Sequence, residues 1–104
     1  MHKAQDTRKH IVYMLVVNGL RYIGVTAKTE ATVLRSVMSR VNKHWYRAQT
    51  EHKDWTLCQV LRTLNSREEI EVKVLDILEG KTAGHHREVE LRRELRPELN
   101  TDCR

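Results

Sequence analysis

The sequence lacks a long hydrophobic run. No apolar stretch in its 104 residues approaches the roughly 20 residues that a membrane-spanning helix needs. The first ten residues, MHKAQDTRKH, are polar and basic, and the apolar run after them is interrupted at Asn18-Gly19. This pattern argues against a signal-peptide core. We therefore expect a cytoplasmic protein that has no membrane partner.

Cysteine is also scarce. Cys58 lies in an apolar helical pattern and Cys103 is next to the last residue, so the two do not form the closely spaced pair that is typical of a metal site. We expect one buried thiol and one thiol in the tail. The chain shows no internal repeat and no low-complexity segment, and its length suits one domain with a modest core.

Positive charge is what the sequence has in excess. It contains 19 lysines and arginines against 14 aspartates and glutamates, which gives a formal charge of +5. A basic protein favours a polyanionic partner, most simply a nucleic acid. The 14 acidic residues distinguish it from a histone-like polycation, and the 39% hydrophobic residues are typical of a globular domain.

The stretch IVYMLVVNGLRYIGVT, residues 11–26, predicts a β-hairpin. Asn18-Gly19 between two apolar runs is the strongest short-range hairpin signal, because a type I′ turn needs positive φ at both central residues. With this two-residue loop, Tyr13 and Tyr22 become diagonal neighbours on one face of the sheet. Gly24 then leaves space across from Tyr13. Both faces are mostly apolar, so we expect the hairpin to be covered on both sides.

The rest of the chain predicts three helices and one more strand. Residues 30–48 have a helical apolar period, with Thr29 as the expected N-cap. We expect a second helix over residues 54–64, a strand over 70–78, and a last helix over 82–95 that ends before the single proline.

The order β-β-α-α-β-α predicts the fold class. It suggests a small α/β (α+β) sandwich in which three strands are covered by three helices. We expect a flexible basic arm at residues 1–9 and a single domain over residues 10–104.

Four segments together resemble the GIY-YIG nuclease domain. They are VYML and RYIGVT in the hairpin, RVNKH in the first helix and REVELRRELRPELN at the end, and the resemblance spans residues 10–101. It implies a three-stranded antiparallel sheet that carries two tyrosines. It also implies an arginine on the first long helix, a metal-binding glutamate on a later helix, and an asparagine after that helix.

The hairpin carries the first part of the resemblance. Tyr13 matches the tyrosine that ends the first motif, and Tyr22 and Gly24 match the second motif, YIG, literally. The pattern departs from the family at Ile11, where the first motif has glycine, and at Val25, where lysine is frequent.

The first helix carries the arginine. Arg40 and His44 reproduce an Arg-x-x-x-His spacing found in some members, and they lie one turn apart on the same face. Arg35 is the alternative, because the gap between the second motif and Arg40 is about two helical turns longer than in compact members.

The last segment carries the metal ligand. Glu88 matches the glutamate, and Asn100 matches the terminal asparagine of an Arg-Pro-x-x-Asn ending known from the excision-repair branch. The resemblance implies that Glu88 holds one Mg²⁺ (or Mn²⁺), mainly through water as that ion prefers.

These residue types suit phosphodiester hydrolysis. Arg40 can bind the phosphate through its planar guanidinium. Tyr13 would activate the attacking water, but an unperturbed tyrosine has a pKa of about 10 and is a weak base at neutral pH. The sequence therefore leaves Tyr13 and His44 both open as the general base. Tyr22 would contact the phosphate or polarise the water.

Further basic and aromatic residues are candidates for contact with DNA. Tyr46 and Trp55 remain open as platforms for bases, whereas Trp45 continues the apolar stripe and is expected in the core. The candidates for phosphate-backbone contact are Lys43, Arg47, Arg92, Arg93 and Arg96.

The sequence thus predicts a metal-dependent DNA endonuclease of the GIY-YIG type. It contains no recognisable targeting module, so we expect low specificity or recognition of DNA structure, with a homodimer or a separate targeting partner as options. The small size suggests a phage or a mobile element. The alternative is an inactive DNA-binding or protein-interaction module of the same fold.

Overall fold

The fold is a small α+β arrangement around one three-stranded sheet. A computed structural model describes residues 8–50 and 56–100. Its elements are β1 (Lys9–Val17), β2 (Leu20–Ala27), α1 (Val33–Thr50), α2 (Thr56–Leu61), η1 (Arg67–Glu69), β3 (Glu71–Glu79), α3 (Lys81–Leu95) and η2 (Glu98–Asn100), where η marks a 3₁₀ helix. Over these residues the expected fold class is confirmed, with three antiparallel strands and three α-helices in the order β-β-α-α-β-α.

The β1–β2 hairpin has the turn and the register that its sequence predicts. Asn18 and Gly19 have φ angles of 52° and 79°, as a type I′ turn requires. Tyr13 pairs directly with Gly24, and the antiparallel ladder runs without a shift along the whole hairpin. Tyr13 and Tyr22 therefore share one face of the sheet.

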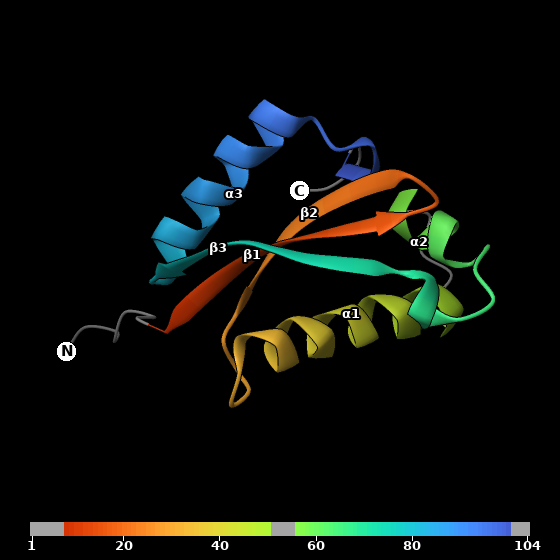
Figure 1. Ribbon diagram of the computed structural model, residues 1–104, viewed down its shortest axis with the longest axis horizontal. Coiled ribbons are helices and arrows are strands. Elements are labelled where there is room, and N and C mark those ends of the chain that lie inside the picture. The colour runs from red at the N-terminus through yellow and green to blue at the C-terminus, as the bar shows by residue number, and fades with distance from the viewer. Residues whose placement is uncertain (1–7, 51–55, 101–104) are drawn as a thin grey trace.

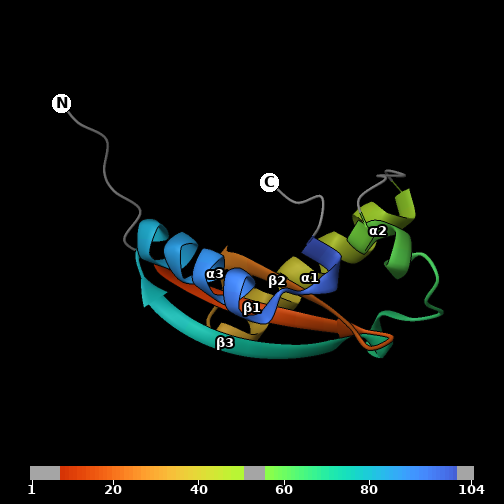
Figure 2. The ribbon, with the colours of Figure 1, turned by 90° about the horizontal axis from the view of Figure 1, so that it is seen from above.

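Helices cover both faces of the sheet, in which β1 is the central strand of the order β2-β1-β3 (Figures 1 and 2). On one face, Ile11 and Leu15 pack in a core with α1 and α2. On the other face, Val12 and Ile23 pack in a core with α3. The predicted two-sided covering is confirmed, and Cys58 is buried in the first core, as expected.

The start of α1 differs from the prediction. The helix begins at Val33 rather than at residue 30, and its first turn is capped by Thr32, whose Oγ1 accepts the Arg35 N–H at 3.1 Å. Thr29 is not the N-cap. Its backbone N–H donates to Ser36 Oγ at 3.1 Å, which ties the preceding loop to the helix. Both threonines precede the apolar stripe, so the sequence pattern alone did not separate them.

Most other boundaries agree with the sequence to within one residue. The exceptions are the end of α1, at Thr50 rather than residue 48, the start of β1, at Lys9 inside the expected arm, and the end of α2, which comes earlier than predicted. Within the described segments, no helix combines the length and the apolar character needed to cross a membrane. Several predictions fall outside the described residues, namely the rest of the arm (residues 1–7), the start of the second helix at Asp54, the Trp55 platform and the tail thiol of Cys103.

α3 approaches the sheet closely at Gly84. A Cβ at this position would lie 2.7 Å from His10 Cβ and 3.3 Å from Val25 Cγ2. The missing side chain therefore lets the helix backbone rest on β1 and β2. This contact was not predicted, because it depends on neighbours that are distant in the sequence.

On the sheet face that α1 covers, the part formed by β3 remains exposed. A β-bulge in the β1–β3 ladder puts Val74 and Ile77 on the α1 face, although they are three residues apart. Their side chains remain 41% and 44% exposed, and Leu34 and Met38 of α1 are 58% and 36% exposed. Five of the six exposed large apolar side chains among the described residues thus belong to α1, where Tyr46 is the third, or to this face of β3.

Candidate active site

Tyr13 and His44 form the centre of the candidate site. Tyr13 is 1% exposed, and its hydroxyl lies 3.0 Å from His44 Nε2, within hydrogen-bonding distance. The Tyr22 ring contacts the His44 imidazole edge-on at a centroid distance of 5.4 Å, and the two tyrosine rings are 6.5 Å apart. β1, β2 and α1 each contribute one of these three rings, so the sequence prediction that places them together is supported by their geometry.

Gly24 makes room for this arrangement. A Cβ at Gly24 would lie 2.6 Å from the Tyr13 hydroxyl oxygen and 3.0 Å from Tyr22 Cε2. Any larger residue would displace the Tyr13 ring, because contacts this short do not occur between non-bonded atoms. The space that the sequence predicted across from Tyr13 is therefore occupied by the Tyr13 hydroxyl itself.

Arg40 brings a positive charge to His44. Burial, together with the charges of Arg40 and Arg47, lowers the pKa of His44 from 6.5 to about 4, and burial is the largest cause. His44 is therefore neutral at pH 7. Arg40 Nε is buried and has no hydrogen-bond partner within the described part of the chain. A buried guanidinium N–H without an acceptor is costly, so an anionic ligand that accepts from it would be strongly favoured.

Arg35 does not lie on the same face of α1 as Arg40. It is exposed, and it lies five residues before Arg40, which places it about 140° away around the helix. Only Arg40 of the two contributes to the electrostatic environment of His44. The geometry favours Arg40 as the arginine of the site.

Asn100 holds the outer edge of β2. Its Oδ1 accepts the Ile23 N–H at 2.8 Å, and its Nδ2 donates to the Ile23 carbonyl at 2.9 Å. These two bonds satisfy the backbone groups of Ile23 that face away from β1. Since Tyr22 and Gly24 flank Ile23, Asn100 fixes the strand segment that carries the second motif. Its observed role is structural, and its catalytic assignment stays a prediction.

A second clamp lies beside the first and was missed by sequence reasoning. Arg21 Nη2 donates to the Leu95 carbonyl at 2.8 Å and to Glu98 Oε2 at 3.2 Å, and the Arg21 N–H donates to Glu98 Oε1. Hydrogen bonds from Arg21 lower the pKa of Glu98 to about 2. The opposite charges of Arg21 and Glu98, each next to a motif residue, were the available sequence signal.

Glu88 belongs to α3, which lies on the face of the sheet opposite α1 (Figure 1). Its side chain is 15% exposed, and its ion pair is with His85 Nδ1 at 3.9 Å. Burial raises the pKa of Glu88, while the nearby charges of Arg92 and His85 act in the opposite direction. Within the described residues, no hydrogen bond or ion pair joins Glu88 to the Tyr13–His44 group.

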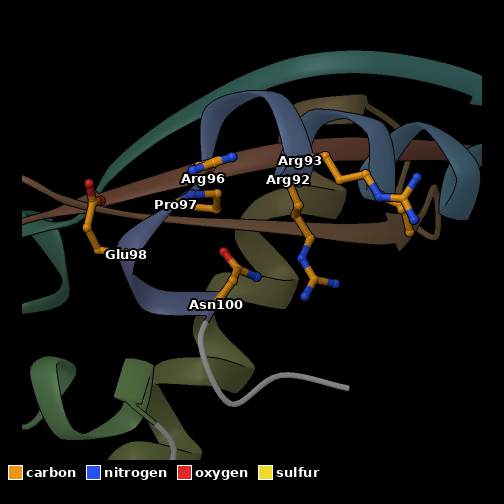
Figure 3. A pocket seen from close by; sticks show the side chains of 7 residues that line it. Arg92, Arg93, Arg96, Pro97, Glu98 and Asn100 are labelled. Carbon is orange, nitrogen blue, oxygen red and sulfur yellow. The ribbon is translucent and has the colours of Figure 1, made fainter.

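A hollow of about 510 Å³ lies beside the end of α3 (Figure 3). It brings together three of the five arginines and lysines that were predicted to contact DNA, and Asn100 forms part of its wall. Because Asn100 is bonded to Ile23, the hollow lies at the same β2 edge as the tyrosine motif. Its lining residues are Val89, Arg92, Arg93, Arg96, Pro97, Glu98 and Asn100.

The other two predicted DNA-contact residues line a separate hollow of about 490 Å³ on α1. Tyr46, one of the two aromatic residues left open as base platforms, lies in this hollow and is 65% exposed. Trp45, by contrast, is partly buried against the first core, as expected. The lining residues are Ser39, Asn42, Lys43, Tyr46 and Arg47.

Comparisons with known proteins add no family assignment. No family model matches the chain, and neither the curated proteins nor the solved structures contain a significant match.

The residues present fit a single magnesium ion held by one carboxylate. The described segments contain no group of three or more histidines, cysteines or acidic residues that would enclose an ion. Glu88 is a half-buried carboxylate whose charge is disfavoured by burial and is balanced only at a distance by His85 and Arg92. A cation at Glu88 would offset that cost, and Mg²⁺ accepts one protein carboxylate with several waters.

Proposed function

We propose that this protein is a metal-dependent DNA endonuclease of the GIY-YIG type. The observation that carries the proposal is the 3.0 Å contact between the Tyr13 hydroxyl and a neutral, buried His44 next to the unpartnered Nε of Arg40. A buried tyrosine–histidine pair beside a cation suits a reaction that removes a proton from water and stabilises an oxyanion. The positive charge of the chain supplies the general attraction to DNA.

Arg40 binds the phosphate in this proposal. Its buried Nε–H has no acceptor among residues 8–50 and 56–100 and would gain one from the phosphate, whose oxygen fits the guanidinium geometry. Tyr22 lies edge-on to His44, where its hydroxyl side can reach the same phosphate or the attacking water. The DNA strand would then run along the outer edge of β2.

Tyr13 and His44 act together as the base. Neutral His44 accepts the Tyr13 hydroxyl proton at Nε2, while the Tyr13 oxygen takes a proton from the attacking water. In such a relay His44 is the final proton acceptor, so Tyr13 does not have to be ionised beforehand. Phosphate binding also counteracts the charges of Arg40 and Arg47, which lower the pKa of His44. His44 therefore becomes a stronger base once substrate is present.

Glu88 would hold Mg²⁺ or Mn²⁺, together with water. The chemistry that such an ion would supply is stabilisation of the phosphoryl charge and of the departing 3′ oxygen. The arginines of the α3 hollow lie beside Asn100, which is bonded to β2, and Glu88 belongs to the same helix, whereas Arg40 belongs to α1 on the opposite face of the sheet. We place this activity in the cytoplasm, with a phage or mobile-element origin.

The test is nicking of supercoiled plasmid and of branched DNA with Mg²⁺ or Mn²⁺. The wild type is expected to nick at least one of them, whereas Glu88→Ala and Tyr13→Phe are expected to lose the activity. EDTA should abolish the wild-type reaction. A pure wild-type preparation that nicks neither DNA, and equals Glu88→Ala, would contradict the proposal.

An interaction module is the second candidate, and the uncovered α1–β3 surface favours it. Leu34, Met38, Val74 and Ile77 expose apolar side chains there, and such surfaces often mark contacts with another protein chain. A homodimer or a separate targeting partner would use this surface. Sedimentation of the wild type and of Val74→Glu tests it: a dimer that dissociates in the variant supports self-association.

A further inference from the structure

The outer face of α1 carries an exposed aromatic ring among cationic groups. Tyr46 is 65% exposed in the hollow of about 490 Å³ that it shares with Lys43 and Arg47. Tyrosine presents an apolar ring with a polar hydroxyl, which suits contact with a ligand. Asn42 forms the far wall of the hollow, and its Oδ1 accepts from Arg67 Nη1 at 2.6 Å. This bond fixes the amide and leaves its N–H donors available to the hollow.

The residues that line the hollow follow His44 in rotation around α1. At about 100° per residue, Arg47 lies roughly 60° from His44, Lys43 roughly 100° and Tyr46 roughly 160° in the same rotational direction. The charge of Arg47 acts on His44, which confirms that the two are close. A cationic strip therefore leads from His44 outward to the Tyr46 ring.

We infer that the Tyr46 hollow binds an unpaired nucleotide of the DNA substrate. The base stacks on the Tyr46 ring, the Asn42 amide can donate to the base edge, and Lys43 and Arg47 contact the flanking phosphates. Aromatic rings that stack bases beside cations are the usual means of binding single-stranded nucleic acid. In duplex DNA the bases are stacked on each other and do not reach the ring. This inference rests on the proposed function, and it makes gapped, flapped or bulged DNA the preferred substrate class.

The test compares two DNAs of the same sequence, one fully paired and one with a short gap that contains 2-aminopurine. Binding is measured with the full chain in EDTA, so that no cleavage occurs. Tyr46→Leu is expected to bind gapped DNA about tenfold more weakly and to lose the quenching of 2-aminopurine, with duplex binding unchanged. Tyr46→Phe is the matched control, because it keeps the ring and should retain both signals.

The outcomes separate the stacking site from the nuclease proposal. If Tyr46→Leu binds gapped DNA as tightly as the wild type does, the stacking site is wrong, even where the wild type nicks plasmid. If the wild type never nicks DNA but prefers the gapped form through Tyr46, the nuclease proposal fails and the stacking site stands. If the wild type binds neither DNA, both are overturned. Lys43→Ala should weaken binding to both DNAs and lower the salt slope by about one.

Discussion

The two faces of the sheet differ in how far their candidate site residues already contact one another without a substrate. On the α1 side, Tyr13, Tyr22 and His44 already contact one another in the free protein. On the α3 side, the one ion pair of Glu88 within the described residues is the long one to His85, and the neighbouring arginines line an open hollow. The α1 side is thus preassembled, whereas the α3 side leaves its charges available.

The difference follows from burial. The α1-side rings sit in the larger core, where packing and one hydrogen bond fix their orientation. α3 has few buried apolar residues, and its backbone approaches the sheet closely at Gly84, which has no side chain. Its position therefore depends on the Asn100 and Arg21 clamps at the β2 edge. In the proposed enzyme, Tyr13 and His44 on the α1 side would transfer the proton of the attacking water. Glu88 and the arginines on the α3 side would bind the metal ion and the DNA phosphates.

The largest expected effect is a loss of nicking rate caused by a substitution on the α1 side of the sheet. Tyr13→Phe keeps the ring but removes the hydroxyl, and general acid–base groups typically contribute about 10² to 10⁴ in rate. We expect a nicking rate lowered by at least about 100-fold at saturating Mg²⁺, with nearly unchanged DNA affinity. Tyr46→Phe is the matched control on the exposed face and should nick normally. Equal rates for Tyr13→Phe and the wild type would show that this hydroxyl does not act in the reaction.

The next effect is the pH dependence of stability that comes from His44. Its pKa is lowered from 6.5 to about 4 in the folded state. Between these values the unfolded chain binds more protons, so the free energy of unfolding falls as pH falls from 6.5 to 4. At 1.36 kcal/mol per pKa unit, the loss is about 3 kcal/mol.

His44→Gln checks this assignment, because glutamine cannot be protonated in this range and can still bond to Tyr13. Urea unfolding at pH 7.5 and pH 4.5 should show a smaller loss for the variant than for the wild type. The other titrating groups are common to both proteins and cancel in the comparison. Parallel losses in the two proteins would mean that His44 is not the buried neutral base.

Two glycine substitutions sharpen the comparison between the sides. Gly24→Ala would clash with the Tyr13 hydroxyl, and Gly84→Ala would clash with His10. Each is expected to cost about 1–3 kcal/mol of stability by overpacking. The two variants should differ in how they change the nicking reaction, however. Gly24→Ala lowers the nicking rate at saturating Mg²⁺, because it moves Tyr13.

Gly84→Ala instead raises the Mg²⁺ concentration needed for half-maximal nicking, because it moves α3 and Glu88. The measurement is a Mg²⁺ titration of the nicking rate for both variants at a temperature where each is folded. If both variants lost rate at saturating Mg²⁺ in equal measure and kept the same half-maximal concentration, the division of roles between the two sides would be wrong.

The sequence predicted the α1 side well because its signals are local. Asn18-Gly19 sets the hairpin register, and that register places Tyr13 across from Gly24. The four-residue spacing from Arg40 to His44 then places both on one helix face. These relations depend on the turn type and the helical repeat, so they can be read without knowledge of the tertiary structure.

The contacts on the α3 side could not be predicted from local sequence signals. The roles of Gly84 and Asn100 depend on contacts with β1 and β2 that are far away in the sequence. The Glu88 position on α3 follows from the helical pattern, but its distance from the tyrosines depends on how the helix packs. The same reason explains why the exposed apolar strip near Val74 was not predicted, since it needs the β3 bulge.

The smallest expected effect concerns the Arg21–Glu98 clamp, which joins β2 to the end of α3. Because the folded pKa of Glu98 is about 2, against an ordinary value of 4.5, its contribution is present above pH 4.5 and is lost as pH falls toward 2. Both side chains are substantially exposed, so solvent and salt screen the pair. Glu98→Gln should therefore lower the urea midpoint only slightly at pH 7, and less in 1 M salt or at pH 3. A midpoint difference that grows at pH 3 would contradict this, because it would require the neutral carboxyl to be the stabilising form.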